Sequence, residues 1–239
     1  MSAASSSSSS IRRLPPLVFP ATGRHTATVI FTHGLGDTGH GWSDAVELWR
    51  RRQRLEEIKF ILPHAPSIPI TMNGGFQMPG WFDIRTIEKG GNEDRQGILR
   101  SRDYFHGLIQ QEIKDGIPAE RIILGGFSQG GAMSILAGLT APVKIGGIVG
   151  LSSWLLLAQK FKEIVPEGDM NKATPIFMGH GDKDPLVRYD LALESEKALK
   201  DLGYSVDLRT YREMQHSACL EELNDVEAFL VERLPRKQT

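Results

Sequence analysis

Short runs rich in β-branched residues alternate with longer amphipathic segments from residue 27 onward. The strand-like and helix-like segments follow one another as 27–32, 43–53, 58–62, 94–114, 122–125, 129–139, 145–151, 175–178, 189–202, 206–211 and 220–234. Such alternation is typical of βαβ units, in which a helix carries the chain from one parallel strand to the next. The sequence therefore predicts an α/β fold, with a mostly parallel twisted sheet covered by helices on both faces.

The 239-residue length fits one large domain, and no internal repeat or interdomain linker interrupts the pattern. Residues 1–20 begin with a serine tract and lack the apolar core of a secretory signal, so we expect a disordered tail. The predicted domain covers 21–239. A transit peptide is the alternative for the tail, because its start is rich in serine, contains Arg12 and Arg13, and has no acidic residue before Asp37.

Composition excludes several classes of function. The net charge is −1, so we expect no nucleic-acid partner, and no apolar run approaches the roughly 18 residues that span a membrane. Cys219 is the only cysteine, which rules out an internal disulfide and a cysteine-based metal site within one chain. We expect no cofactor, at most transient membrane contact, and a cytoplasmic protein, with the nucleus as a further compartment.

The segment Gly126–Gly130 matches the pattern G-x-S-x-G, which places a serine on a sharp turn between a strand and a helix. The apolar run Ile122–Leu124 precedes it, and small residues suited to a helix start follow it. Glycine-sized neighbours allow strand and helix to approach closely at such a turn. This context, more than the pattern itself, makes Ser128 the candidate nucleophile.

A serine nucleophile needs a base and an acid. Enzymes that carry the G-x-S-x-G motif on a strand-turn-helix supply them in the chain order Ser, Asp or Glu, His. His216 is the only histidine that follows both Ser128 and the carboxylates Asp182 and Asp184, so it is the predicted base. Pro185 disfavours a helical conformation at Asp184, which mildly favours that carboxylate as the acid. Asp182 then has the ordinary role of stabilising its own turn.

The tetrahedral intermediate of such a reaction also requires two backbone donors for its oxyanion. The Gln129 N–H directly follows the nucleophile, and the glycine-flanked turn after the first strand can direct the Leu35 N–H into the same place. Gly34, Gly36 and Gly39 also match the dinucleotide fingerprint G-x-G-x-x-G. That alternative is disfavoured because the acidic residues about 20 positions on precede the next strand rather than follow it.

Two connections, 63–93 and 152–174, are much longer than usual αβ links and are unusually apolar. Long ordered loops often carry function. Trp154 and the leucines that follow it can be read equally well as protein core or as a surface for an acyl chain.

Several segments together resemble the acyl-protein thioesterases, a family also described as lysophospholipases or small carboxylesterases of the α/β-hydrolase fold. The segments that carry the resemblance are 29–42, 63–66, 78–83, 116–118, 121–131 and 180–187. Several of them are far more specific than a bare G-x-S-x-G. The similarity extends over about residues 25–235.

The resemblance implies a Ser-His-Asp triad in which Asp184, rather than Asp182, is the acid, with Ser128, His216 and the Leu35 and Gln129 amides in the roles given above. It also implies an acyl channel beside the two long loops, for which we name the candidate substrate-binding residues Phe76, Met78, Trp81, Phe82, Trp154 and Leu155. The implied substrates are palmitoyl-like thioesters on protein cysteines, with lysophospholipids as a further class.

Departures from the family pattern lie near these loops and at the start of the chain. Some members carry an acylated N-terminal cysteine, which this sequence lacks. The segment 151–157 lacks the expected cysteine and proline around Trp154, and Gly74–Phe76 is also atypical, so acyl-chain preference is the property these changes would affect. A general carboxylesterase for short esters and a catalytically silent hydrolase fold that binds a small molecule remain the alternatives.

Overall fold

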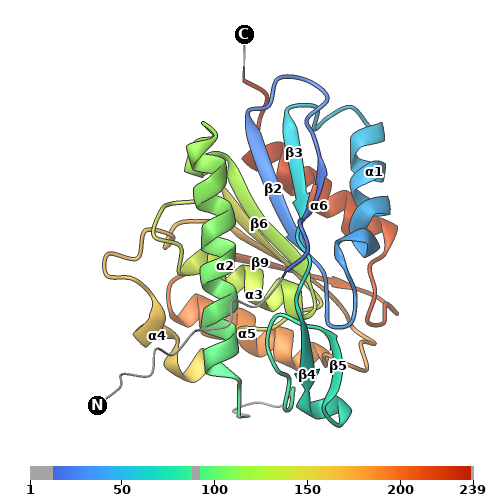
Figure 1. Ribbon diagram of the computed structural model, residues 1–239, viewed down its shortest axis with the longest axis vertical. Coiled ribbons are helices and arrows are strands. Elements are labelled where there is room, and N and C mark those ends of the chain that lie inside the picture. Colours follow the sequence, from blue (N-terminus) through green and yellow to red (C-terminus); the bar gives the residue numbers. More distant parts are fainter. Residues whose placement is uncertain (1–12, 88–91, 238–239) are drawn as a thin grey trace, which may run out of the picture.

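The computed structural model describes residues 13–87 and 92–237. A seven-stranded sheet with strand order β1-β3-β2-β6-β7-β8-β9 forms its centre, and all neighbours are parallel except β1 and β3 (Figure 1). The strands are β1 Leu17–Phe19, β2 Ala27–Thr32, β3 Ile58–Leu62, β6 Ile122–Phe127, β7 Gly147–Leu151, β8 Ile176–Gly181 and β9 Val206–Tyr211. The predicted α/β class is confirmed.

Helices cover both faces of this sheet. They are α1 Ser43–Arg51, α2 Arg95–Lys114, α3 Gln129–Leu139, α4 Phe161–Ile164, α5 Tyr189–Asp201 and α6 Leu220–Arg233, with short 3₁₀ turns at Gly39–Trp42, Thr71–Asn73, Ala119–Arg121 and Ala158–Lys160. Apolar side chains of α1 and α6 pack on one face in a cluster that includes Trp49 and Val226. Those of α2, α3 and α5 pack on the other face, with Phe105 and Leu199 among them (Figure 1).

The N-terminal boundary differs from the prediction. Leu17–Phe19, which we assigned to a disordered tail ending at residue 20, form the edge strand β1 and pair antiparallel with β3. Leu17 and Phe19 also pack against the cluster under α1 and α6, and this apolar contact gives the short strand a reason to remain on the sheet. The serine tract, and with it most of the predicted tail, lies outside the described residues.

The first long connection also contains structure that the sequence did not predict. Strands β4 Ser67–Ile70 and β5 Phe76–Pro79 form an antiparallel hairpin beside the main sheet, with Ser67 opposite Pro79 (Figure 1). Gly74 and Gly75, with φ of 65° and 81°, supply the left-handed conformations of its turn. Proline argues against a central strand, but a two-stranded hairpin tolerates it because each strand has an unpaired edge.

Within the described residues, no helix combines the length and apolar character needed to cross a bilayer.

Candidate active site

Ser128 occupies the sharp turn between β6 and α3. Its backbone has φ 53° and ψ −123°, a conformation that L-residues rarely adopt and that is held here by the surrounding structure. The Ser128 N–H donates to the Leu151 carbonyl of β7 at 2.8 Å. A Cβ at Gly130 would collide with the His33 carbonyl oxygen, so only glycine permits this approach of α3 to the end of β2.

The structure brings three of the predicted residues into one hydrogen-bonded row. His216 Nε2 lies 2.9 Å from Ser128 Oγ, and His216 Nδ1 lies 2.7 Å from Asp184 Oδ2. The three side chains come from the turns that follow β6, β8 and β9, which all end at the carboxyl edge of the sheet. Parallel pairing of these strands therefore assembles residues that are 56 and 88 positions distant from Ser128 in the chain.

Asp184 is held as a carboxylate by its surroundings. Burial alone would raise the pKa of this group, but hydrogen bonds from His180, His216 and the Val187 N–H outweigh that effect and hold the pKa well below its usual range. Oδ1 accepts the Leu186 and Val187 N–H groups, each at 2.9 Å, which leaves Oδ2 facing His216. The carboxylate is thus charged and fixed in direction.

Asp182 has a different position from Asp184. Its side chain accepts the Glu213 N–H at 2.7 Å and so joins the loop after β8 to the loop after β9. That is the turn-stabilising role that the sequence left open for it. The geometry selects Asp184 as the partner of His216.

The two predicted oxyanion donors lie on either side of the nucleophile turn. Gln129 is the first residue of α3, and Leu35 lies in the turn after β2, where a Cβ on Gly34 would come within 3.2 Å of Ser128 Cβ. Neither the Leu35 N–H nor the Gln129 N–H has a hydrogen-bond acceptor in the part of the chain that the structure describes. Two unpaired amides beside a serine hydroxyl can receive an oxyanion.

Trp81 and Phe82 have a position that corrects the sequence interpretation. Both side chains are buried in the core, and Trp81 is only 1% exposed, whereas we named them as substrate-binding residues. The indole packs edge-on against Phe105 at 4.9 Å between ring centroids and lies 6.4 Å from the Tyr104 ring. These contacts with α2 explain why the rings point into the protein rather than toward a ligand.

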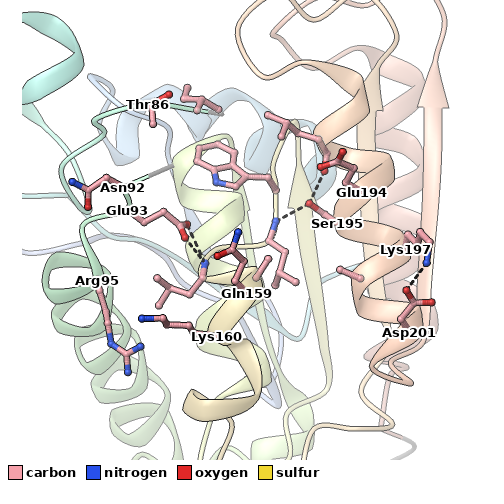
Figure 2. A pocket seen from close by; sticks show the side chains of 17 residues that line it. Thr86, Asn92, Glu93, Arg95, Gln159, Lys160, Glu194, Ser195, Lys197 and Asp201 are labelled. Atoms are coloured by element: carbon pink, nitrogen blue, oxygen red, sulfur yellow. Dashed lines mark hydrogen bonds and ion pairs between the residues drawn. The ribbon is translucent and has the colours of Figure 1, made fainter. Parts of the chain in front are cut away.

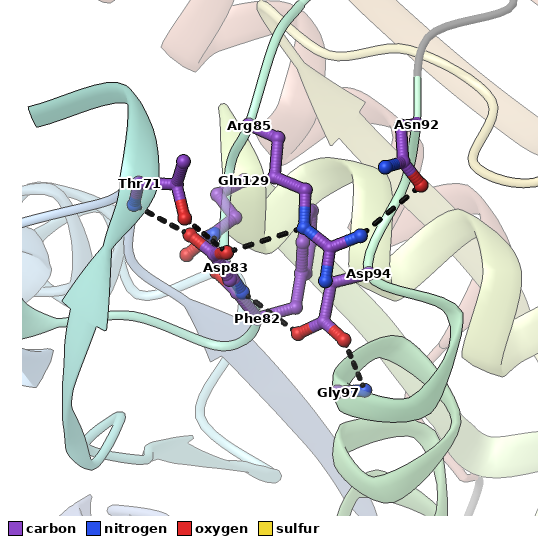
Figure 3. Close-up of polar contacts among 8 residues, drawn as sticks. All are labelled: Thr71, Phe82, Asp83, Arg85, Asn92, Asp94, Gly97 and Gln129. Carbon is purple, nitrogen blue, oxygen red and sulfur yellow. Dashed lines mark hydrogen bonds and ion pairs between the residues drawn. The ribbon is translucent and has the colours of Figure 1, made fainter. Parts of the chain in front are cut away.

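The segment that carries these two residues is tied to the nucleophile turn and to the hairpin. The Gln129 amide accepts the Trp81 N–H at 2.8 Å and donates to the Phe82 carbonyl at 2.7 Å. Figure 3 shows the continuation: the Asp83 carboxylate accepts the Thr71 N–H and hydroxyl from the hairpin, and the Asp83 N–H donates to the Asp94 carboxylate that caps α2. The segment 81–83 thus joins α3, the hairpin and α2.

A cavity of about 550 Å³ lies between α5 and the two long connections (Figure 2). Two of the candidate substrate-binding residues, Trp154 and Leu155, are in its wall, and their contact with a substrate stays a prediction. The wall also contains the apolar side chains of Ile87, Leu157, Ala158, Leu191 and Ala198. Charged side chains, among them Arg95 and Lys160, also line it (Figure 2). The cavity therefore offers both apolar and charged groups to a ligand.

Sequence analysis did not identify two further residues of this cavity, Ser195 and Glu93. The Ser195 hydroxyl on α5 accepts the Leu155 N–H at 2.9 Å, and the Glu93 carboxylate accepts the Leu157 N–H at 3.0 and 3.1 Å (Figure 2). Burial raises the pKa of Glu93, although its bond with Leu157 opposes this. Ser195 could have been identified from its position on the inward face of the amphipathic pattern of α5. No feature of the sequence indicated that Glu93 would line the cavity.

Phe76 and Met78 lie on β5, outside the wall of this cavity. The Phe76 ring is 74% exposed at the start of the strand. Met78 faces the turn after β2, where its sulfur would lie 4.0 Å from a Cβ at Gly36, and it accepts the Asn73 side-chain amide at 3.3 Å. Contact of these two residues with a substrate stays a prediction.

Comparison with known proteins agrees with this geometry. Residues 15–233 match the sequence profile of a family described as phospholipase/carboxylesterase. The chain belongs to this family. It is therefore a hydrolase enzyme, and its seven-stranded sheet is that of the α/β-hydrolase fold.

Individual relatives extend over nearly the whole chain. A Neurospora crassa protein named acyl-protein thioesterase 1 is 62% identical over 232 residues, which is 95% of each chain. A Gibberella zeae protein of the same name is 60% identical and covers 94% of this chain and 98% of its own. The crystal structure of Zea mays acyl-protein thioesterase 2 superposes with a TM-score of 0.82 at 30% identity, covering 92% of this chain and 98% of that one.

Proposed function

We propose that this hydrolase cleaves acyl thioesters on protein cysteines, with Ser128 as nucleophile, His216 as general base and Asp184 as the acid that orients it. The observation that carries the proposal is the hydrogen-bonded row from Ser128 Oγ through His216 to Asp184. The names of the relatives in Neurospora crassa and Gibberella zeae support the thioester as substrate.

The reaction follows the two-step course of serine hydrolases. As Ser128 Oγ attacks the acyl carbonyl, His216 Nε2 takes its proton, and the Asp184 carboxylate stabilises the resulting imidazolium. The Leu35 and Gln129 N–H groups hold the oxyanion of the tetrahedral intermediate. Its collapse breaks the C–S bond, and the leaving thiolate recovers the proton from His216. Water then attacks the acyl-serine by the same sequence and releases the fatty acid.

The leaving group makes a thioester a favourable substrate for this arrangement. A cysteine thiol has a pKa near 8.5, far below that of an alcohol, so its departure depends less on proton donation by His216. The same residues also cleave oxygen esters, and lysophospholipids form a second proposed substrate class. The triad alone does not distinguish the two, which leaves the distinction to the binding surface.

We assign the acyl chain to the cavity lined by Trp154 and Leu155. The segment 152–155 begins at the end of β7, whose Leu151 carbonyl holds the Ser128 N–H, and runs directly into the cavity wall. The cavity volume of about 550 Å³ is that of an ordinary small-molecule site, and part of its lining is apolar. Burying each methylene of the chain there contributes about 0.8 kcal/mol.

The deciding measurement is kcat/KM on a palmitoylated cysteine peptide beside a short-chain p-nitrophenyl ester, with Ser128→Ala as the blank. The proposal expects the long thioester to be preferred and the blank to be inactive on both. Preference for the short ester, abolished by the same substitution, would make the protein a general carboxylesterase. Full activity of the blank would refute the role of Ser128.

A further inference from the structure

We propose that Trp81 is a positioning residue for the oxyanion hole, holding both predicted oxyanion amides in place from inside the core. This inference rests on the proposed function, since it concerns the same two donors. Four groups of the segment 79–82 make the relevant contacts. The Pro79 carbonyl and the Trp81 indole bind the turn after β2, and the Trp81 N–H and the Phe82 carbonyl bind the Gln129 side chain at the start of α3.

On the side of Gln129, the contact is a pair of hydrogen bonds with fixed polarity. The Trp81 N–H can only donate and the Phe82 carbonyl can only accept, so the Gln129 amide bridges them in a single orientation, at 2.8 and 2.7 Å. This side chain is fully buried. Its attachment fixes the first residue of α3, whose own backbone N–H points to the oxyanion.

On the side of Leu35, the contact passes through His33. The Trp81 indole Nε1–H donates to the His33 carbonyl at 2.8 Å, and the His33 Nδ1–H donates to the Gly34 carbonyl at 2.7 Å. That carbonyl belongs to the same planar peptide unit as the Leu35 N–H, and in a trans peptide the two groups point in opposite directions. Holding the carbonyl therefore directs the amide.

A further bond closes the turn from its other end, where the Gly36 N–H donates to the Pro79 carbonyl at 2.8 Å. The turn has one hydrogen bond of its own, from the Asp37 N–H to the Gly34 carbonyl at 3.3 Å, and it packs against the start of α3 at Gly130. The segment 79–82 adds hydrogen bonds to both sides, to the turn and to the Gln129 side chain. These bonds restrain the two amides relative to each other.

The test compares Trp81→Phe with Phe105→Leu. The first removes the indole donor and keeps an aromatic ring and the backbone N–H, whereas the second loosens the same ring cluster without removing a hydrogen bond. We expect Trp81→Phe to lower kcat about fivefold to tenfold with little change in KM, the effect of about one lost hydrogen bond felt in the transition state. Phe105→Leu should lower Tm and leave kcat near the wild-type value.

A second readout separates positioning from general loosening. A palmityl trifluoromethyl ketone forms an oxyanion adduct with the serine, whereas palmitate binds without one. The affinity for the ketone should fall in parallel with kcat in Trp81→Phe, and the affinity for palmitate should not change. Gln129→Met, which removes both side-chain bonds but keeps the backbone N–H, should behave in the same way and serves if Trp81→Phe folds poorly.

The inference is overturned if Trp81→Phe and Gln129→Met alter only Tm, as Phe105→Leu does, or if they weaken ketone and palmitate binding equally. Such a result would leave the proposed function intact. The proposed function has its own criterion, since it fails when Ser128→Ala retains thioesterase activity. The two failures are therefore distinguishable in one set of assays.

Discussion

His33 and His216 show how neighbouring atoms give two imidazoles at one sheet edge different roles. The His33 nitrogens face the Gly34 carbonyl and the Ala65 N–H, so the ring is neutral, with its proton on Nδ1 and both nitrogens occupied. His216 instead faces a hydroxyl and a carboxylate, which lets it gain a proton on Nε2 while Asp184 stabilises the charge. Only the second ring can exchange protons with a substrate.

The two carboxylates after β8, Asp182 and Asp184, allow the assignment of the catalytic acid to be tested by single substitutions. Asp184→Asn should lower kcat by about 10⁴-fold, because an amide does not stabilise the imidazolium and can hold His216 in the wrong tautomer. Asp182→Asn is the matched control, since its contact is to the Glu213 N–H and the acceptor oxygen is retained. Steady-state kinetics on a thioester, with circular dichroism to verify folding, would measure both. Equal losses in the two variants would contradict the assignment of the acid.

At the scale of elements, the sequence was most informative where one pattern had one physical explanation. Alternating strand and helix periods predicted the parallel strands and crossover helices closely, because both patterns report burial against the same sheet. The hairpin β4–β5 was not predictable in this way. Pro69 and Pro79 hide its strand pattern, and tertiary contacts such as those of Asp83 with Thr71 and of the Gly36 N–H with the Pro79 carbonyl hold it in place.

The candidate site could be predicted to the extent that it depends on chain order. The G-x-S-x-G context predicted Ser128 and the Ser, Asp, His order predicted His216, but this reasoning left Asp182 and Asp184 as candidate acids. Pro185 favoured Asp184 only mildly, and the family resemblance made the choice. The position of Trp81 could not be deduced, because an aromatic residue in an apolar loop fits a ligand surface and a core equally well. The indole is in the core because it packs against Phe105 of α2, a contact between residues that are distant in the sequence.

Helix α5 gives the element-scale prediction, because it forms one wall of the cavity assigned to the acyl chain. Ala198→Phe places a ring in that cavity and should lower kcat/KM for palmitoyl substrates at least tenfold, with a smaller effect on acetyl or butyryl esters. Leu193→Phe is the control, since Leu193 lies on the exposed side of the same helix. A series of p-nitrophenyl esters of increasing length measures the effect. An equal decrease for short and long esters would place the acyl chain elsewhere.

At the scale of the whole molecule, buried titratable groups set how stability depends on pH. Burial lowers the pKa of His25, His33, His64 and His106, so each favours its neutral form in the folded state. As the pH falls through about 6.5, the unfolded chain binds these protons first, and stability is lost. The histidines therefore lower the free energy of unfolding as the pH falls below about 6.5.

Glu222 on α6 has the opposite effect. Burial, together with the charge of Asp225, raises its pKa to about 8, and neither carboxyl oxygen has a hydrogen-bond partner among the described residues. Between the ordinary glutamate pKa of about 4.3 and pH 8, the folded state holds this proton more tightly than the unfolded chain. Stability therefore decreases as the pH rises through this window.

The two effects together predict a stability maximum near pH 7, and Glu222→Gln isolates the contribution of the glutamate. One proton per molecule changes the free energy of unfolding by about 1.4 kcal/mol per pH unit at most, so between pH 6.5 and 8 the wild type should lose about 2 kcal/mol relative to the glutamine variant. The histidine contributions are common to both proteins and cancel in this difference. Urea unfolding at pH 5.5, 6.5 and 8 gives these values, with Glu221→Gln, at an exposed neighbouring position, as control. A difference between wild type and Glu222→Gln that stays constant from pH 6.5 to 8 would show that Glu222 is ionised in the folded protein at neutral pH.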